Sequence, residues 1–384
     1  MLHSINATYL SRILSLAQVP CQTFGSLFEI QGFAKYNQLL SVNGVFSSRP
    51  NYWPIDRTET INSPLRLALY RTWQQPAQAS TLDDSLYHRV TELCTGNEVC
   101  NILWSGGIDS TTVLTAFLRF APDLKQVRVL YSPWSEYEHP GYVSWIKTKY
   151  PTLDIVDISG DVYIHEKFDG LLITGDGGDE SMASLDESFY SRTGFETLNK
   201  PWKDYFFQLL GPKGSDLIDF YDRFCMLSGR PIDSLLEARW WYYQAVKADS
   251  ILRETKIQLL TSDSNKIHHQ RLVGFFDCDQ FLAFIYFNLD KIITDEGYEN
   301  WKKCLKRFCF EHDGFNDWYH KKIKYNSLQL AKYFRKKIVL SDKRWIAVLA
   351  NGDKITTPNL PFLNQIDLDE YCPGLIANII NDAD

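Results

Sequence analysis

Short apolar runs alternate with amphipathic stretches between residues 99 and 181, and this is the most regular pattern in the chain. Such alternation of strand-like and helix-like segments predicts an α/β fold built on a doubly wound parallel sheet. The expected strands are 99–104, Val127–Tyr131, Leu153–Ile158 and Leu171–Thr174, and the expected helices between them are 111–120 and Tyr142–Tyr150.

The segments on either side of this region have other patterns. Residues 1–80 are mixed, with short strand-like runs at Phe24–Phe33 and Leu39–Phe46 between turn residues. A helix with an acidic first turn is expected from Thr81 to about Cys94. We therefore expect a small mixed N-terminal region followed by a main domain over 81–384.

The chain is predicted to be mainly helical after about residue 182. Long aromatic-rich stretches occur there, notably Leu235–Ala248 and Phe275–Phe287. The last stretch, Thr356–Asp384, has three prolines and an acidic end and is expected to be partly loose.

A polar, glycine-rich turn follows the first strand of the α/β region, and we call it the first loop (Ser105–Ser110). Its sequence is Ser-Gly-Gly-Ile-Asp-Ser, and it leads into a predicted helix. Gly106 and Gly107 lack Cβ atoms, so the backbone can bend sharply and approach an anion closely. The free N–H groups and the dipole at a helix start favour phosphate. The pattern predicts an ATP phosphate site, and the alternative is a simple turn between strand and helix.

Hydroxyl and carboxylate groups refine this prediction. Ser105 and Ser110 add hydroxyl donors to the first loop, whereas the Asp109 carboxylate would repel phosphate directly. The expected use of Asp109 is therefore to hold Mg²⁺ against the phosphates.

A second turn of the same kind follows the strand at 171–174, and we call it the second loop (Gly175–Glu180). It contains three glycines and three acids. Ligands of open α/β sheets bind at the carboxyl ends of the strands, so the two loops are expected to share a site. Mg²⁺ held by Asp109 and Asp179 would explain the clustered carboxylates. For Glu180 the alternative is that it begins the next helix, where the dipole favours an acid.

Composition narrows the class of protein. The chain has 384 residues, a net charge of −7 and 45% hydrophobic residues, which is typical of a globular protein and makes a nucleic-acid partner unlikely. No apolar run approaches the ~20 residues of a membrane-spanning helix. The eight cysteines form no Cys-x-x-Cys pair, so free thiols in a reducing cytoplasm are expected.

The two loops, in this order and at this separation, resemble the synthetase domain of asparagine synthetases. This domain belongs to the ATP-pyrophosphatase group, and its relatives include β-lactam and carbapenam synthetases and lasso-peptide cyclases. The resemblance covers about residues 80–350 and is strongest over 99–181. Weaker similarities lie at Glu136–Tyr142, Arg271–Asp277, Lys324–Gln329 and Asp342–Trp345.

The resemblance implies a two-step reaction that requires ATP and Mg²⁺. A substrate carboxylate attacks the α-phosphate of ATP, and an amine then displaces AMP from the acyl-adenylate. Asp176 is placed near the attacking amine, and Lys343, or failing that Lys324, is implied to stabilise the adenylation transition state. The implied metal ligands are Asp109 and Asp179, and the implied ATP and pyrophosphate contacts are Ser105, Gly106, Gly107, Asp109, Ser110, Leu130, Tyr131, Gly175, Gly177 and Gly178.

Departures from the family suggest a specialised amide-forming enzyme. The region before residue 80 is about half the length of a glutaminase domain, so glutamine hydrolysis is not expected. Ser181–Leu185 also replaces the family's Leu-Phe-Gly-Gly-Tyr segment. We expect a small-molecule or peptide carboxylate and a separate amine donor, with companion biosynthetic proteins and a macrolactam cyclase as one form of the enzyme. The alternatives are a nucleobase or tRNA modification enzyme and a non-catalytic nucleotide-binding partner.

Overall fold

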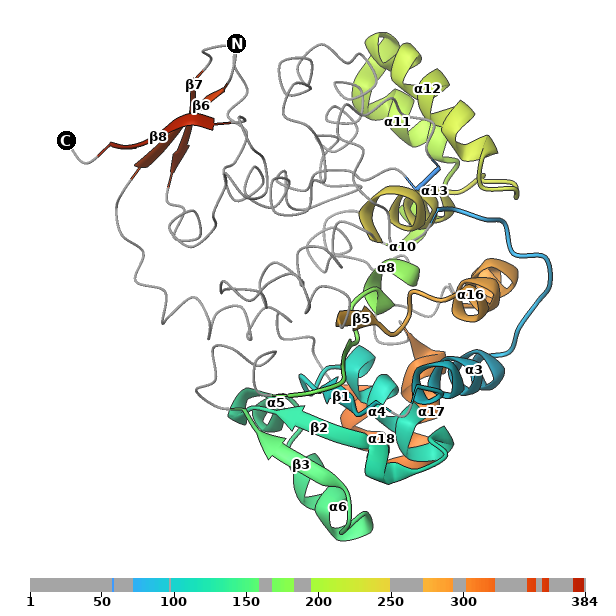
Figure 1. Ribbon diagram of the computed structural model, residues 1–384. Coiled ribbons are helices and arrows are strands. Elements are labelled where there is room, and N and C mark those ends of the chain that lie inside the picture. The colour runs from blue at the N-terminus through green and yellow to red at the C-terminus, as the bar shows by residue number, and fades with distance from the viewer. Residues whose placement is uncertain are drawn as a thin grey trace. The chain divides into compact units, whose positions relative to one another are not determined.

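The computed structural model describes most of the α/β region and several helices (Figure 1). The described residues are 57–58, 72–96, 98–158, 168–182, 195–248, 272–292, 302–321, 344–349, 354–358 and 376–382. The chain divides into two compact units that interleave along the sequence. Unit 1 comprises Met1–Gln74, Lys200–Asp263 and Arg335–Asp384, and unit 2 comprises Gln75–Asn199 and Ser264–Phe334.

Unit 2 contains a five-stranded sheet in the order β3-β2-β1-β4-β5. All four neighbouring pairs of strands are parallel. The strands are β1 (Cys100–Leu103), β2 (Val127–Tyr131), β3 (Asp154–Asp157), β4 (Leu171–Thr174) and β5 (Leu272–Gly274). The predicted α/β class and its parallel sheet are confirmed. The strand order reverses between β1 and β4, and this reversal is where such sheets bind ligands.

The central strands are apolar because both of their faces are covered. Ile102, Val129 and Ile173 are fully buried in β1, β2 and β4. Asn101 is a buried polar residue of β1, and its side-chain amide donates to the carbonyls of Asp169 at 2.7 Å and Leu171 at 3.1 Å. These bonds fix β1 to the segment that leads into β4, the strand carrying the second loop.

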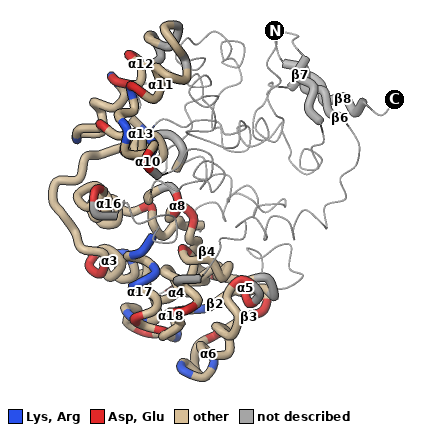
Figure 2. Tube along the Cα trace, turned by 180° about the vertical axis from the view of Figure 1, so that it is seen from behind, with Lys and Arg blue, Asp and Glu red and all other residues tan. Residues whose placement is uncertain are grey.

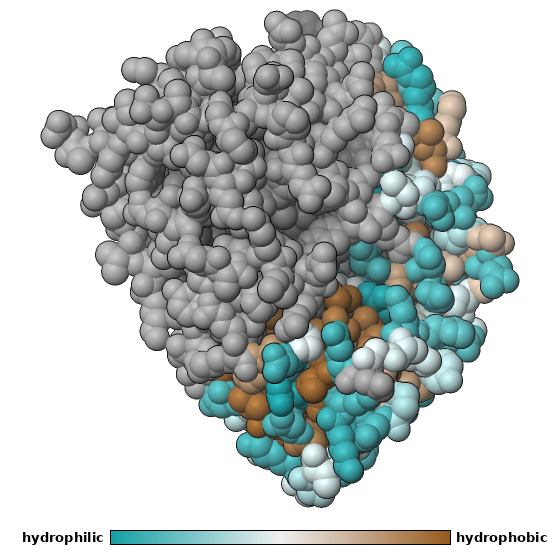
Figure 3. Space-filling model, viewed as in Figure 1, coloured by the Kyte–Doolittle hydropathy of each residue, from teal (hydrophilic) through white to brown (hydrophobic). Residues whose placement is uncertain are grey.

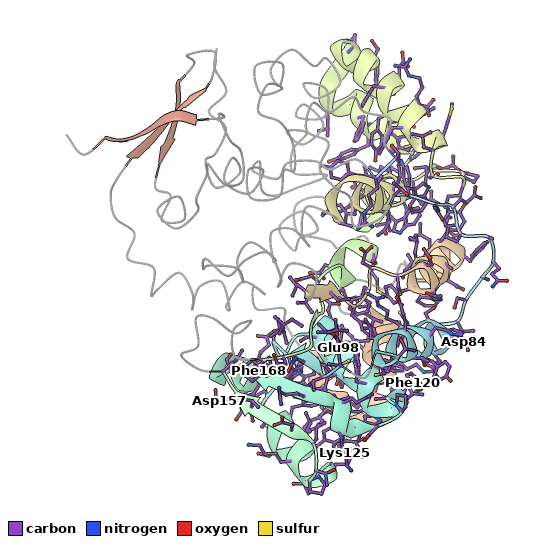
Figure 4. The ribbon with its side chains drawn as sticks, viewed as in Figure 1. Asp84, Glu98, Phe120, Lys125, Asp157 and Phe168 are labelled. Atoms are coloured by element: carbon purple, nitrogen blue, oxygen red, sulfur yellow. The ribbon has the colours of Figure 1, made fainter. Side chains whose placement is uncertain are left out.

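Helix α4 (Ile108–Phe120) begins in the first loop and is buried along most of its length. It packs against α3 (Leu82–Cys94) and α17 (Lys303–Asp313). Phe120, labelled in Figure 4, lies with its ring centroid 5.8 Å from that of Tyr87 on α3 and 6.1 Å from that of Phe308 on α17. The helices predicted at Thr81–Cys94 and 111–120 are thereby confirmed to within a few residues.

The other helices of unit 2 are shorter or lie later in the chain. The helix predicted at Tyr142–Tyr150 is present as α6. α16 pairs with α3, and α18 follows α17. Their bounds are η2 (Leu124–Gln126), α5 (Pro133–Glu138), α6 (Tyr142–Lys149), α8 (Gly178–Ser181), α10 (Phe195–Leu198), α16 (Asp279–Ile292) and α18 (Asn316–Lys321).

The described part of unit 1 contains an aromatic helical cluster. Trp202, Trp240 and Trp241 are buried, and the ring of Trp73 lies 4.8 Å from that of Trp241. Phe207 of α11 and Met226 of α12 are exposed. Figure 3 shows mostly hydrophilic colour over these two helices, with a few hydrophobic residues among it. The elements are α11 (Trp202–Leu210), η3 (Gly211–Gly214), α12 (Ser215–Met226), α13 (Leu235–Tyr242) and the π-helical η4 (Tyr243–Lys247).

A mainly helical region after the first four strands is therefore confirmed, and within the described residues it has two exceptions. One is β5, which joins the sheet of unit 2. The other is a three-stranded antiparallel sheet in the order β7-β6-β8, whose strands are β6 (Arg344–Leu349), β7 (Lys354–Pro358) and β8 (Ile376–Asp382). The strands expected at Phe24–Phe33 and Leu39–Phe46 lie outside the described residues.

Within the described part of the chain, every helix is too short or too polar to cross a membrane. This agrees with the absence of a long apolar run in the sequence.

His312, near the end of α17, has a strongly shifted pKa. Its Nε2 atom lies 2.8 Å from the hydroxyl of Tyr150, and the two rings are stacked. Burial lowers the pKa of His312 to about 4, and the positive charges of Lys149 and Arg119 act in the same direction. Burial has the opposite effect on the neighbouring Asp313 and raises the pKa of its carboxyl group.

The lowered pKa of His312 predicts that the stability of the protein falls in acid. Between pH 6.5 and about 4 the unfolded chain binds a proton that folded His312 does not, so stability is lost as pH falls through this window. Because the side chain is partly exposed, we expect the loss to be about 1–2 kcal/mol. Urea denaturation at pH 7.5 and 4.5 should show a larger loss in the wild type than in His312→Gln. Asp313 titrates in both proteins, so parallel pH curves would contradict the prediction.

Candidate functional site

The first loop connects β1 to α4 and is shaped by glycine. Gly106 has a φ of +78°, and a Cβ atom there would lie 2.3 Å from the Ser135 carbonyl oxygen of α5. Gly107 is the N-cap of α4. The Ser105 and Ser110 hydroxyls are hydrogen-bonded to each other at 2.9 Å. The loop therefore holds two hydroxyl groups at the start of a buried helix.

The second loop follows β4 and lies against the first. A Cβ atom at Gly175 would be 2.8 Å from the Ser110 backbone nitrogen. A Cβ atom at Gly178 would be 2.6 Å from Oδ1 of Asp109 and 2.9 Å from the ring of Phe276. These two glycines are what allow the loops to approach so closely. The predicted convergence of the loops at one edge of the sheet is thus present in the fold.

A lysine joins the carboxylates of the two loops. The Lys302 ammonium nitrogen lies 2.6 Å from Oδ2 of Asp109 and 2.5 Å from Oδ1 of Asp179. The side chain of Lys302 is only 7% exposed, and those of Asp109 and Asp179 are 21% and 23% exposed. Figure 2 shows acidic residues, in red, on α8 and basic residues, in blue, beside α17. The two acids expected to share Mg²⁺ are therefore brought together around one cation.

Tertiary packing holds Lys302 in place. It is the residue before α17 and has a left-handed backbone, with φ 58° and ψ 27°. No other non-glycine residue in the described ranges has a positive φ. Helix α17 contacts α4 through the Thr112 hydroxyl, 3.4 Å from the sulfur of Cys309, and through the Arg119 guanidinium, 4.4 Å from the ring centre of Phe308. Packing of α17 on α4 thus carries Lys302 to the helix that bears Asp109.

The end of β2 lies beside the first loop. The Trp104 backbone N–H donates to the Leu130 carbonyl at 2.9 Å, and the Ile158 N–H donates to the Tyr131 carbonyl at 2.8 Å. Ser135 of α5 donates its hydroxyl to the Trp104 carbonyl at 2.7 Å. The first bond joins the carboxyl ends of β1 and β2, the second joins those of β2 and β3, and the third holds α5 to the residue after β1. Contact of Leu130 and Tyr131 with adenine stays a prediction.

Of the remaining predicted site residues, some lie in the second loop and others lie outside the described residues. Asp176 is in the second loop, and its backbone N–H donates to the Thr174 hydroxyl at 3.3 Å. Gly177 has a φ of +90° and Gly178 begins α8. Lys324 and Lys343 lie outside the described residues. Lys302 was not predicted, because its sequence neighbourhood has no motif and only its left-handed backbone and packing distinguish it.

The two carboxylates suit a metal ion that binds together with phosphate. In the described ranges there is no group of three or more His, Cys, Asp or Glu side chains that could hold a metal ion by itself. Mg²⁺ at phosphate sites is usually bound by one or two carboxylates, with phosphate oxygens and water completing the shell. Asp109 and Asp179 fit this arrangement as the two protein ligands.

Comparison with known proteins adds no family to this description. The chain matches no protein-family model and no curated protein. The resemblance to asparagine synthetases therefore depends on the two loops and on the parallel sheet that carries them.

Proposed function

We propose that this protein forms amide bonds by activating a carboxylate with ATP. The observation that carries the proposal is the contact between the two loops at the carboxyl ends of β1 and β4. There the Asp109 and Asp179 carboxylates lie within hydrogen-bond distance of one cation, beside the start of α4. This is the combination that a magnesium–polyphosphate complex requires.

The first loop is the proposed cradle for the phosphates. The backbone N–H groups at the start of α4, a helix of 13 residues, offer donors and a favourable dipole. The Ser105 and Ser110 hydroxyls would exchange their mutual hydrogen bond for bonds to phosphate oxygens. Mg²⁺ held by Asp109 and Asp179 would supply the positive charge that makes pyrophosphate a good leaving group.

The proposed reaction has two displacement steps. A carboxylate oxygen of the substrate attacks the α-phosphorus, and the bond to the bridging oxygen of pyrophosphate breaks. An amine nitrogen then attacks the acyl carbon, and AMP leaves with the electrons of the acyl–oxygen bond. Asp176 is the proposed group that orients the amine or accepts its proton. Lys343 and Lys324 stay sequence-based candidates for stabilising the first transition state.

The proposed substrates are a small-molecule or peptide carboxylate and a separate amine. Ring closure within a modified peptide, which would make the protein a macrolactam cyclase, satisfies both requirements in one molecule. Companion biosynthetic proteins would then deliver the peptide.

One observation favours a second candidate, a non-catalytic nucleotide-binding protein. The Lys302 ammonium already pairs with both carboxylates. A protein whose acids are permanently neutralised in this way would bind nucleotide without turning it over. Modification of a nucleobase or tRNA is a third possibility, and no contact in the described residues favours it.

Exchange of pyrophosphate into ATP separates the candidates. The protein is incubated with ATP, Mg²⁺, labelled pyrophosphate, candidate amines and pools of carboxylic acids and peptides, and labelled ATP and AMP are followed. We expect acid-dependent AMP release that falls about 100-fold or more in Asp109→Asn, the scale of losing one group that stabilises transition-state charge. Asp154→Asn, on the exposed edge strand β3, is the control and should keep full activity.

Each candidate gives a different result in this assay. AMP release that needs RNA or a nucleobase would contradict amide formation. Nucleotide binding without turnover, even with candidate peptides and amines present, would favour the non-catalytic protein. Equal activity of Asp109→Asn and the wild type would remove the proposed role of Asp109.

A further inference from the structure

The cation between the two loops is part of the chain itself. Lys302 places one buried ammonium group between Asp109 and Asp179, with nitrogen–oxygen distances of 2.6 Å and 2.5 Å. Two carboxylates brought together at low exposure repel each other unless a positive charge lies between them. Lys302 supplies that charge from within the chain.

A divalent ion and the ammonium group cannot occupy this position together. Mg²⁺ takes carboxylate oxygens at about 2.0–2.1 Å, so two oxygens on one ion are roughly 4 Å apart or closer. The Lys302 nitrogen already occupies the space between oxygens of the two acids. Binding of a metal by both carboxylates therefore requires the ammonium to leave.

The backbone conformation of Lys302 indicates that surrounding contacts hold this residue in place. A left-handed conformation is unfavourable for a non-glycine residue, and such outliers persist only when surrounding contacts over-determine them. At Lys302 these contacts are the two ion pairs and the packing of α17 on α4.

From these observations we propose that Lys302 is a built-in counter-ion that a divalent metal must displace from Asp109 and Asp179. The protein alone then binds the metal weakly. Nucleotide phosphates would raise the affinity by giving the displaced ammonium a new anionic partner, and this second part rests on the proposed function. The coupling is reciprocal, so the metal raises the affinity for nucleotide by the same factor.

Titration of Mn²⁺ into nucleotide-free protein tests the first part directly. Free Mn²⁺ is measured by electron paramagnetic resonance for the wild type, Lys302→Met and Lys303→Met. Lys302→Met removes the ammonium but keeps an unbranched side chain, and we expect it to bind Mn²⁺ at least tenfold more tightly than the wild type. Lys303→Met makes the same charge change at the exposed neighbouring residue and should bind like the wild type.

Thermal unfolding gives a second readout. Without metal, Lys302→Met leaves two carboxylates without this cation, so its melting temperature should fall below that of the wild type. Millimolar Mn²⁺ should restore much of the loss in Lys302→Met and change the wild type little. Adding Asp109→Asn to Lys302→Met should remove the gain in Mn²⁺ affinity.

Two further variants separate the loss of the positive charge from the effect of the left-handed backbone. Lys302→Gly relieves the backbone conformation while removing the charge, so its Mn²⁺ affinity should match that of Lys302→Met. Lys302→Arg keeps the charge and should bind Mn²⁺ as weakly as the wild type. The proposal is overturned if neither charge-removing variant binds Mn²⁺ more tightly than the wild type.

The nucleotide part is tested with a non-hydrolysable ATP analogue. The analogue should raise the Mn²⁺ affinity of the wild type by a larger factor than that of Lys302→Met. An equal factor in both proteins would overturn the coupling while leaving the displacement intact. Because neither titration involves turnover, failure of the AMP assay would not alter the Mn²⁺ result.

Discussion

Replacing Gly106 by alanine is expected to lower the free energy of unfolding by about 3 kcal/mol and to abolish binding of nucleotide at the first loop. The φ of +78° alone costs an alanine roughly 1–2 kcal/mol. The new methyl group would also lie 2.3 Å from the Ser135 carbonyl oxygen, which is backbone and cannot rotate away. Overpacking of this kind adds about 1–3 kcal/mol. Urea denaturation measures the total.

Gly141 provides a matched control for this prediction. Its φ is +81°, but a Cβ atom there would meet no atom within 4 Å. Gly141→Ala should therefore show the backbone effect alone, about 1–2 kcal/mol, with nucleotide binding retained. Equal losses of stability in the two variants would mean that the close contact of the first loop with α5 adds nothing to the free-energy cost of the Gly106→Ala substitution.

The difference between these variants measures how firmly α5 frames the first loop. Ser132 and Ser135 form a capping box at the start of α5, and the Ser135 hydroxyl also donates to the Trp104 carbonyl at 2.7 Å. The helix follows β2 directly in the chain and is thereby also held to the residue after β1. A loop confined in this way keeps its shape before any ligand arrives, which lowers the entropy lost on binding.

The strands β1, β2 and β4 could be predicted because each is a mainly apolar run that ends in a polar turn. The expected bounds Val127–Tyr131 and Leu171–Thr174 are those of β2 and β4. By contrast, β5 was missed, since three residues are too few to show a period and its partner β4 lies far away in the chain. The stretch Leu235–Ala248 was predicted as helix, but its second half is π-helical.

The candidate site was predictable only where its chemistry is local. In each loop the residues that suggest a phosphate and metal site are adjacent in sequence, so the site can be predicted without knowing the fold. Lys302 is 193 residues from Asp109, and nothing near it in the sequence distinguishes it from other lysines. Its partners come from the packing of α17 against α4, which one sequence does not reveal. The sequence-based choices for a site lysine, Lys343 and Lys324, lie outside the described residues.

Lys302 also changes what the paired carboxylates mean. The sequence pattern predicts a metal ion between Asp109 and Asp179, since like charges need a cation between them. The fold contains an ammonium group that meets this need without a ligand. Clustered acids are therefore not by themselves evidence of catalysis here. Acid-dependent AMP release is the result that would establish catalysis, whereas displacement of Lys302 by a metal would establish only that the two carboxylates bind the metal.

Replacing Gly175 by alanine tests whether the two loops form one site. No positive φ is involved, but the new methyl group would lie 2.8 Å from the Ser110 nitrogen and 3.0 Å from the Asp109 carbonyl carbon. Both are backbone atoms at the buried start of α4, so the second loop must move away. We expect a loss of stability of about 1–2 kcal/mol. Because Asp179 moves with the loop, the rise in melting temperature that ATP and Mg²⁺ give the wild type should disappear.

Gly96 supplies the control for Gly175. It follows α3, and a Cβ atom there would have its nearest neighbour at 3.9 Å, an ordinary contact. Gly96→Ala should melt like the wild type and respond fully to ATP and Mg²⁺. A Gly175→Ala protein that still responds fully would contradict the shared site, because the ligand would then bind without the close approach of the two loops. Loss of the response in Gly175→Ala alone would instead locate the nucleotide at the junction of β1 and β4.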